Sequence, residues 1–251
     1  MLHIIDAIRI YEKSLGNKEN IFTGDLLSEK ERTYIVSNCN AFLIGLISDQ
    51  SVKAETAWSL PYKLSKRLDI SDPNEIAETY SMEEVKAVIK QKPALHRYPG
   101  NIAGYIWLAS KKLCQEYDGQ ASNIWKEATA AEIVKRLEAF KGISHKKAAL
   151  ACLLLVRDFG LDVPDKENID IIYELHIRKI FLRAGFCEHD SYEAITQAAR
   201  KINPEFPGYL TSAFWAIGRE ICHPNDPECG ICPINNFCKY YERKKPDEQS
   251  N

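Results

Sequence analysis

Residues 221–238 read ICHPNDPECGICPINNFC, and their four cysteines follow the spacing C-x6-C-x2-C-x5-C. These cysteines are Cys222, Cys229, Cys232 and Cys238. Four thiolates on one short loop can converge on a soft centre, either a [4Fe-4S] cluster or tetrahedral zinc. Zinc ribbons usually carry two C-x2-C pairs, whereas this loop has one pair flanked by single cysteines, which favours the iron-sulfur cluster. The alternative is four unrelated cysteines or two disulfides, although such cysteines rarely gather in so short a segment.

The composition predicts a soluble globular chain of one large or two small domains. The chain has 251 residues, of which 45% are apolar and 27% charged, and a formal net charge of -2 at pH 7. A nucleic-acid interface therefore needs a local basic patch rather than bulk charge. The N-terminal stretch carries Asp6 and Glu12 and lacks a signal peptide's apolar core, and no apolar run is long enough to span a bilayer. The isolated cysteines elsewhere fit a reducing compartment, so we expect a cytoplasmic protein, associated with the nucleoid in a prokaryote.

The helical signal is nearly continuous, and no stretch alternates apolar and polar residues as a strand would. Capping boxes at Ser28, Ser81 and Thr129 predict three helix starts, and Asp190 with Glu193 predicts a fourth. Further helices are predicted over 2–15, 52–67, 101–117, 145–158, 169–184 and 208–221, with short ones near 73 and 124. The helix that starts at Ser28 is expected to run to Asp49. The sequence therefore predicts an all-α fold of about ten helices.

The turn FKGISHKKA at 140–148 is the second informative stretch. A capped helix precedes it and the apolar helix AALACLLLV (148–156) follows, so it forms a tight turn between antiparallel helices, with Gly142 supplying the unusual backbone angles. The free amides at the start of the second helix attract a phosphate. Positive charge is added by Lys141, His145, Lys146 and Lys147. The alternative is a helix–helix corner with a solvated basic face.

These two stretches together resemble the endonuclease III family of base-excision DNA glycosylases. In that family a helix-hairpin-helix motif, L-P-G-V-G-R-K-T-A, precedes a four-cysteine loop with the same gaps. The nine motif positions are taken here, in order, by Phe140, Lys141, Gly142, Ile143, Ser144, His145, Lys146, Lys147 and Ala148. The resemblance implies that DNA is held by Lys141, Gly142, Ile143, Ser144, His145 and Lys147. Ser144 departs from the second glycine of the motif, which implies a slightly different turn.

The resemblance also implies two catalytic residues. Lys146 takes the place of the family's nucleophilic lysine, whose neutral amine attacks C1′ of the damaged nucleotide and forms a Schiff base that permits β-elimination. Glu174, in YELH (173–176), stands where the family has the aspartate of V-D-x-H, and its carboxylate would stabilise the oxocarbenium-like sugar. Glutamate is one methylene longer, and the interval from Lys146 is longer than in the family. Asp170 or Asp165 is therefore the alternative catalytic carboxylate. A further alternative is that Glu174 is a surface residue without a catalytic role.

A third match is LISDQ (46–50), which resembles the family's L-L-S-x-Q. The family's glutamine fills the gap left by the flipped nucleotide, a role that falls to Gln50 here. The resemblance implies two helical domains. One is a bundle over 27–150 that ends in the helix-hairpin-helix, and the other combines 1–26 with 151–251 and carries the iron-sulfur loop at 222–238.

Three functions agree with these motifs. The favoured one is a base-excision repair glycosylase with abasic-site lyase activity, acting as a monomer on double-stranded DNA with a damaged base or an abasic site. It would flip out the base and cleave its N-glycosidic bond through a Schiff base at Lys146, with oxidised pyrimidines as the expected substrates. The second is a monofunctional glycosylase for alkylated or mismatched bases, in which Lys146 only contacts phosphate. The third is a catalytically weak DNA-binding iron-sulfur protein.

Overall fold

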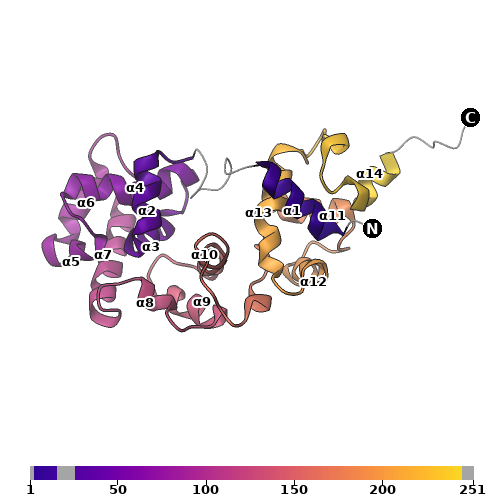
Figure 1. The fold of residues 1–251 in the computed structure, drawn as a ribbon. Coiled ribbons are helices and arrows are strands. Elements are labelled where there is room, and N and C mark those ends of the chain that lie inside the picture. The colour runs from indigo at the N-terminus through magenta and orange to yellow at the C-terminus, as the bar shows by residue number, and fades with distance from the viewer. Residues whose placement is uncertain (1–2, 16–25, 245–251) are drawn as a thin grey trace, which may run out of the picture. The chain divides into compact units, whose positions relative to one another are not determined.

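The computed structural model describes residues 3–15 and 26–244, and all regular secondary structure in these two ranges is helical. The chain packs into two compact units (Figure 1). Unit 1 comprises residues 1–16 and 165–251, and unit 2 comprises residues 17–164. The predicted all-α fold is confirmed over the described ranges. The domain limits expected after residues 26 and 150 remain a prediction.

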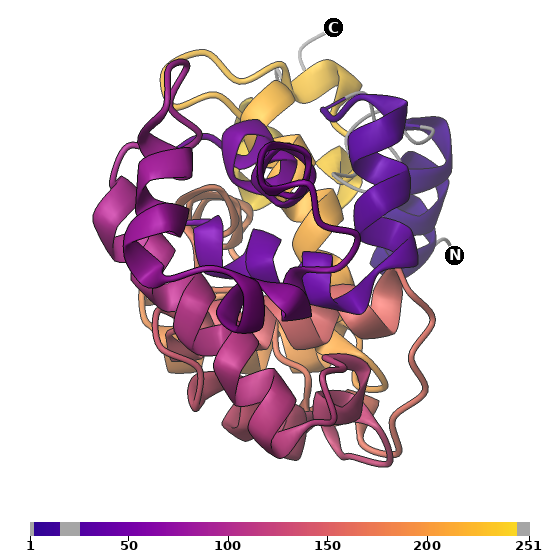
Figure 2. The same ribbon diagram turned by 90° about the vertical axis from the view of Figure 1, so that its left-hand side faces the viewer.

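Within residues 26–164, unit 2 is a bundle of nine short and medium helices, which Figure 2 shows face-on. They are α2 (Glu29–Ser37), α3 (Cys39–Ser48), α4 (Ala54–Leu68), α5 (Ile76–Thr79), α6 (Met82–Lys90), α7 (Pro99–Glu116), α8 (Ser122–Trp125), α9 (Ala130–Glu138) and α10 (His145–Arg157), with a 3-10 turn η1 at Pro73–Glu75. Complete capping boxes form at Ser28, Ser81 and Thr129, so these three predicted helix starts are confirmed.

The single helix predicted from 28 to 49 is wrong, because Asn38 divides it into α2 and α3. Asn38 adopts an extended conformation, and its side-chain oxygen accepts the Ala41 N–H at 2.9 Å, which caps α3. Its amide nitrogen donates to the Asp72 carboxylate at 2.9 Å. A partner 34 residues away thus fixes the break, and local propensity does not reveal it.

Helix α3 forms the centre of the unit 2 core, since every residue from Asn40 to Ser48 is buried. The buried Asn40 side chain donates to the Gly119 carbonyl at 2.9 Å and accepts the Ala121 N–H at 2.7 Å, so its polar atoms are satisfied. Gly45 allows the Trp58 ring to lie directly on the helix backbone, because a Cβ at this position would lie 2.5 Å from a ring carbon.

Replacing Gly45 with alanine is expected to destabilise the protein by about 1–3 kcal/mol, because the buried Trp58 ring must move to admit the methyl group. This loss exceeds the gain in helix propensity, which is about 1 kcal/mol. Urea unfolding followed by circular dichroism measures the change. The matched control is Gly100→Ala in α7, where the nearest atom to an added Cβ is 3.8 Å away. Equal stability of the two variants would contradict this account of the α3 packing.

Unit 1 joins the first helix of the chain to its C-terminal part. It contains α1 (Ile4–Leu15), α11 (Leu175–Ala184), α12 (Tyr192–Ile202), α13 (Leu210–Glu220) and α14 (Lys239–Lys244), with 3-10 turns η2 (Lys166–Asn168), η3 (Pro207–Tyr209), η4 (Cys229–Ile231) and η5 (Asn235–Phe237). Helix α1 packs beside α13 (Figure 1), and Ile8 is fully buried in one core with Phe181 and Phe214. The Phe181 and Phe214 rings lie 5.0 Å apart, edge to face.

Two predicted helix starts in unit 1 are wrong. The helix expected from 169 begins at Leu175, because the backbone before it bonds to another segment: the Ile169 carbonyl accepts the Gly208 N–H at 2.7 Å. The helix expected from Asp190 has Ser191 as its N-cap instead. The Asp190 carboxylate is bound by the Arg178 guanidinium, at 2.8 Å from Nε.

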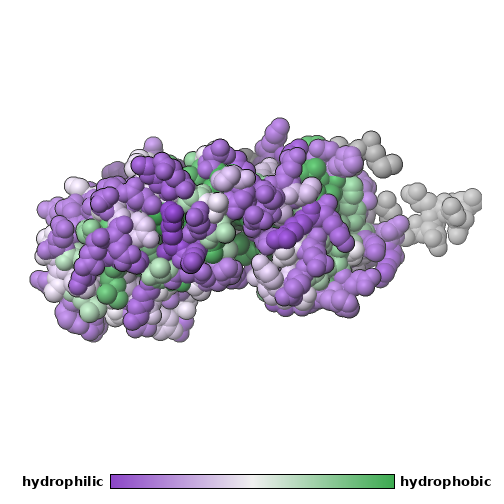
Figure 3. Space-filling model, turned by 90° about the horizontal axis from the view of Figure 1, so that it is seen from below, coloured by the Kyte–Doolittle hydropathy of each residue, from purple (hydrophilic) through white to green (hydrophobic). Residues whose placement is uncertain are grey.

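The surface seen in Figure 3 is mostly hydrophilic, with hydrophobic side chains exposed only in small groups. None of the described helices is long and apolar enough to cross a membrane.

Candidate functional site

The turn between α9 and α10 is shaped by Gly142. This residue has φ +91°, and a Cβ here would lie 2.5 Å from the Tyr105 ring, so both the backbone angle and the space require glycine. Phe140 and Ile143 are buried on either side of it, and the Ile143 N–H donates to the Phe140 carbonyl at 3.1 Å. The buried flanks fix the turn and direct the polar residues outward.

The start of α10 offers backbone donors to an external acceptor. Ser144 is its N-cap in an extended conformation, but its hydroxyl makes no capping bond to the helix. A helix N-terminus left in this state favours an anion. The exposed side chains here are Lys141, Ser144, His145 and Lys146. His145 Nδ1 lies 2.9 Å from the Glu138 carboxylate, so this imidazole already has an acidic neighbour.

Lys147 points inward, unlike its neighbour Lys146. Its Nζ donates to the carbonyl oxygens of Ile47 and Gly142, each at 2.9 Å. Burial lowers the pKa of Lys147 from 10.5 to about 8, and the Asp49 carboxylate opposes part of this effect. Burial also raises the pKa of Asp49 and lowers that of His96, which shares this environment. A neutral amine keeps two N–H groups, so both hydrogen bonds can persist in either protonation state.

The lowered pKa of Lys147 predicts a pH-dependent stability. Below about pH 8 the folded and unfolded chains both carry the proton; between about pH 8 and 10.5 the folded chain releases it first. The unfolded state then binds more protons, so the free energy of unfolding rises with pH, by roughly 2 kcal/mol after allowance for the solvated part of the side chain.

Urea unfolding between pH 8 and 10.5 measures this rise in the free energy of unfolding. We expect it in the wild type and in Lys135→Met, a control variant at an exposed lysine of α9. The rise should be absent in Lys147→Met. If the free energy of unfolding changes with pH in the same way in Lys135→Met and Lys147→Met, Lys147 is not the group responsible.

The segment after α3 carries Gln50, whose side chain is half-buried. Gln50 Nε2 donates to the Ile47 carbonyl at 2.6 Å, the same oxygen that accepts from Lys147. The buried His96 also holds this segment. Its Nδ1 accepts the Tyr98 N–H at 3.0 Å, so its Nε2 carries the proton and donates to the Ser48 carbonyl at 3.2 Å. The structure thus brings Gln50 and the hairpin turn together within unit 2.

Glu174 lies in unit 1, where it is the N-cap of α11 and not a mid-helix residue. Its Oε1 accepts the Ile177 N–H at 2.6 Å, so the carboxylate is held at a helix N-terminus, where negative charge is stabilised. Asp170, one of the alternative carboxylates, is bound by both Nε and Nη2 of Arg200, at 2.8 and 3.0 Å. Asp165 precedes the 3-10 turn η2 without capping it through its side chain.

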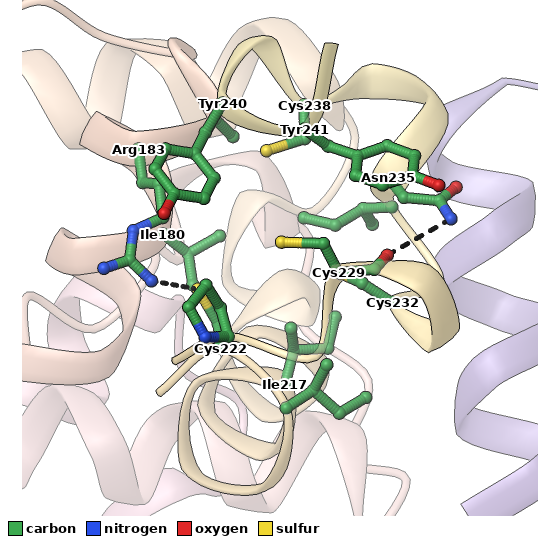
Figure 4. Close-up of a pocket in the computed structure, with 14 residues that line it drawn as sticks. Ile180, Arg183, Ile217, Cys222, Cys229, Cys232, Asn235, Cys238, Tyr240 and Tyr241 are labelled. Atoms are coloured by element: carbon green, nitrogen blue, oxygen red, sulfur yellow. Dashed lines mark hydrogen bonds between the residues drawn. The ribbon is translucent and has the colours of Figure 1, made fainter. Parts of the chain in front are cut away.

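The four loop cysteines line one cavity of unit 1 (Figure 4). All four are half-buried and free, and Figure 4 shows the thiols of Cys229 and Cys238 pointing into the cavity. The remaining wall is mainly apolar, with Ile217 and Ile234 among its residues. No group of three or more His, Cys, Asp or Glu side chains in the described ranges is close enough to hold a single metal ion.

The chemistry of this cavity fits a group bound by four thiolates. Arg183 Nη1 donates to Cys222 Sγ at 3.2 Å and to the His223 carbonyl at 2.8 Å, which places a positive charge beside the sulfur. Burial raises the pKa of Cys232 to about 11, and burial also raises the pKa of Cys229, so these two thiols are protonated without a metal and lose their protons on binding one.

Sequence reasoning missed the inward direction of Lys147 and the roles of Asp49, His96 and Arg183. The one sequence feature that indicated the inward direction of the Lys147 side chain is that the motif has threonine at this position. Nothing in the sequence indicated the roles of Asp49 and His96, because these roles depend on contacts between distant segments. Arg183 lies on α11 and gave no signal either, because its partner Cys222 is 39 residues away in the sequence.

Comparisons with known proteins identify the fold. No model of a known protein family matches the chain. It is 30% identical over 79 residues to endonuclease III of Thermotoga maritima, spanning 31% of this chain and 37% of that protein. It is 27% identical over 161 residues to endonuclease III of Rickettsia felis, spanning 53% of this chain and 74% of that protein. The chain thus aligns with little more than a third of the first relative's length.

A solved structure agrees over nearly the whole chain. The structure of a trapped endonuclease III–DNA covalent intermediate superposes with a TM-score of 0.62 at 18% identity, covering 98% of this chain and 100% of that one. All regular secondary structure described here is helical, as the resemblance implies. The chain therefore has the endonuclease III-like DNA glycosylase fold.

Proposed function

We propose that this protein is a base-excision DNA glycosylase with abasic-site lyase activity. The observation that carries the proposal is the position of Lys146. It is an exposed amine in the first turn of α10, directly after a turn whose glycine is enforced by Tyr105. This chain shares its fold with a protein that was trapped as a covalent intermediate with DNA.

The hairpin turn holds the DNA backbone. The amides at the start of α10, together with the exposed Lys141, bind a phosphate and fix the register of the duplex without reading its sequence. Gln50 enters the stack when the damaged nucleotide leaves it, and thereby keeps the nucleotide extrahelical.

Lys146 supplies the nucleophile. Its neutral amine attacks C1′ of the flipped nucleotide, the N-glycosidic bond breaks, and the base leaves with the electron pair and takes up a proton. Loss of the amine proton and opening of the sugar ring give the imine. Removal of a C2′ proton then expels the 3′ phosphate by β-elimination, and water releases the enzyme.

Glu174 supplies the negative charge. Its carboxylate stabilises the oxocarbenium-like sugar. The bond from Ile177 N–H fixes one carboxylate oxygen, so the orientation of the group is set by α11 itself. The bidentate pairing of Asp170 with Arg200 makes that aspartate the weaker candidate for this role.

Cys222, Cys229, Cys232 and Cys238 would hold a [4Fe-4S] cluster. When bound, the cluster cross-links the loop and contributes stability rather than taking part in base removal. The single C-x2-C pair favours this cluster over zinc.

The test uses 5′-labelled duplexes that carry one oxidised pyrimidine or one abasic site. Alkali-labile sites report base release, cleavage without alkali reports the lyase step, and borohydride reports the imine. We expect base release, cleavage and a trapped complex. Base release without cleavage or trapping would indicate a monofunctional glycosylase, and binding without any chemistry would overturn the proposal.

A further inference from the structure

Lys147 connects two segments that the chain separates by 100 residues. It begins in the first turn of α10, and its Nζ reaches the Ile47 carbonyl at the end of α3 at 2.9 Å. The last carbonyls of a helix have no partner within the helix, so this oxygen is available for a side-chain donor. The second bond of Nζ goes to the carbonyl of Gly142, in the hairpin turn itself.

The Ile47 carbonyl also receives the side chain of Gln50. Gln50 Nε2 lies 2.6 Å from the same oxygen that Lys147 contacts. The Ile47 carbonyl oxygen therefore accepts hydrogen bonds from two side chains. One is Gln50, which is proposed to enter the base stack, and the other is Lys147, which also bonds to the phosphate-binding turn at Gly142. A shift of α3 relative to the turn has to break or lengthen one of these bonds.

The surroundings of Lys147 are held in place by side chains from other elements. Asp49 and His96 are the titratable groups that interact with it, one from the end of α3 and one from the loop before α7. Asp49 is itself held by Trp58, whose Nε1 donates to it at 3.3 Å. His96 is bonded to the Ser48 carbonyl at 3.2 Å, so the two residues that follow Ile47 are both held by side chains of other elements.

We infer that Lys147 is a positioning residue for nucleotide flipping, which sets Gln50 in register with the phosphate-binding turn. This inference rests on the proposed function. Threonine, the residue at this place in the motif that the hairpin resembles, is too short to bridge the two carbonyls. The coupling is thus a property of this chain and not of the motif.

The test measures flipping separately from binding and from chemistry. A duplex carries 2-aminopurine next to the target nucleotide, and its fluorescence at saturating protein reports unstacking in each bound complex. Lys147→Met keeps the length of the side chain and removes its donors. It is expected to lower the flipping constant about tenfold, with DNA affinity changed less than about threefold, because phosphate contacts supply most of the affinity. Lys135→Met, which removes one exposed lysine of the same unit, is expected to change neither.

A double-mutant cycle with Gln50→Ala distinguishes positioning from loss of fold. If Lys147 acts through Gln50, Lys147→Met has little further effect in the Gln50→Ala background. Additive effects would overturn the inference. Lys147→Thr provides the same test should the methionine variant unfold, as judged by circular dichroism. Wild-type protein that fails to unstack the reporter overturns both this inference and the proposed function, whereas normal wild-type flipping with additive variants overturns this inference alone.

Discussion

Lys146→Ala is expected to lose the borohydride-trapped protein–DNA complex, with the trapped fraction on an abasic-site duplex falling by more than about a hundredfold. The reason is chemical: without the amine no imine forms, so borohydride has nothing to reduce. Lys146 is exposed, and its side chain makes no hydrogen bond or ion pair in the contacts described above, so its loss is not expected to disturb the fold. Denaturing gel electrophoresis of the labelled duplex measures the covalent band.

The neighbouring lysine provides the matched comparison for this experiment. An abasic site has no base to flip, so Lys147→Met should keep most of the trapped band even though it removes the bonds to Ile47 and Gly142. If the band persists in Lys146→Ala and disappears in Lys147→Met, the nucleophile is Lys147 and the assignment to Lys146 is wrong. DNA binding by each variant, measured by fluorescence anisotropy, shows whether lost trapping reflects lost chemistry.

Cys232→Ala is expected to remove the metal centre and to destabilise unit 1 on the order of 3 kcal/mol or more, because metal binding and folding of the loop are coupled. Burial raises the pKa of both Cys229 and Cys232, and Cys232 is the more deeply buried of the two. Its thiolate is therefore unfavourable until a metal binds. The measurements are iron, sulfide and zinc content, visible absorbance, and limited proteolysis mapped along the chain. We expect cleavage to increase within residues 165–244 while α2 to α10 stay protected.

Cys187→Ala is the control for the cluster, because Cys187 is a half-buried cysteine of the same unit outside the loop. It should keep a full complement of iron and sulfide. Bound zinc without sulfide in the wild type would replace the iron-sulfur assignment. Unchanged metal content in Cys232→Ala would show that the centre is held elsewhere.

The sequence predicted those parts of the fold that depend on near neighbours. Capping boxes at Ser28, Ser81 and Thr129 are complete within four residues, and the sequence placed all three. The apolar run after Lys147 is buried, as its composition indicated, since residues 151–156 form an unbroken buried stretch. Gly142 was identified correctly as a residue with positive φ.

The failures depend on distant partners. Asn38 ends a helix because Asp72 bonds to it, and Asp190 fails to cap a helix because Arg178 binds it. The segment before Glu174 is extended because the Gly208 N–H donates to the Ile169 carbonyl and the Thr211 hydroxyl accepts the Ile172 N–H. The sequence alone therefore placed Glu174 inside a helix instead of at its start. The inward direction of Lys147 has the same origin, because its acceptor at Ile47 lies on another helix.

The packing of α1 on α13 has a consequence for how the protein is made. A ribosome releases α1 before unit 2, but helix α13, which packs on α1, is not complete until residue 220 has emerged. The intervening residues 17–164 contain all the helices of unit 2, so that unit can fold while α1 waits with its apolar face exposed. During synthesis α1 is therefore a site for chaperone capture. Slow elongation between residues 165 and 220 prolongs that exposure.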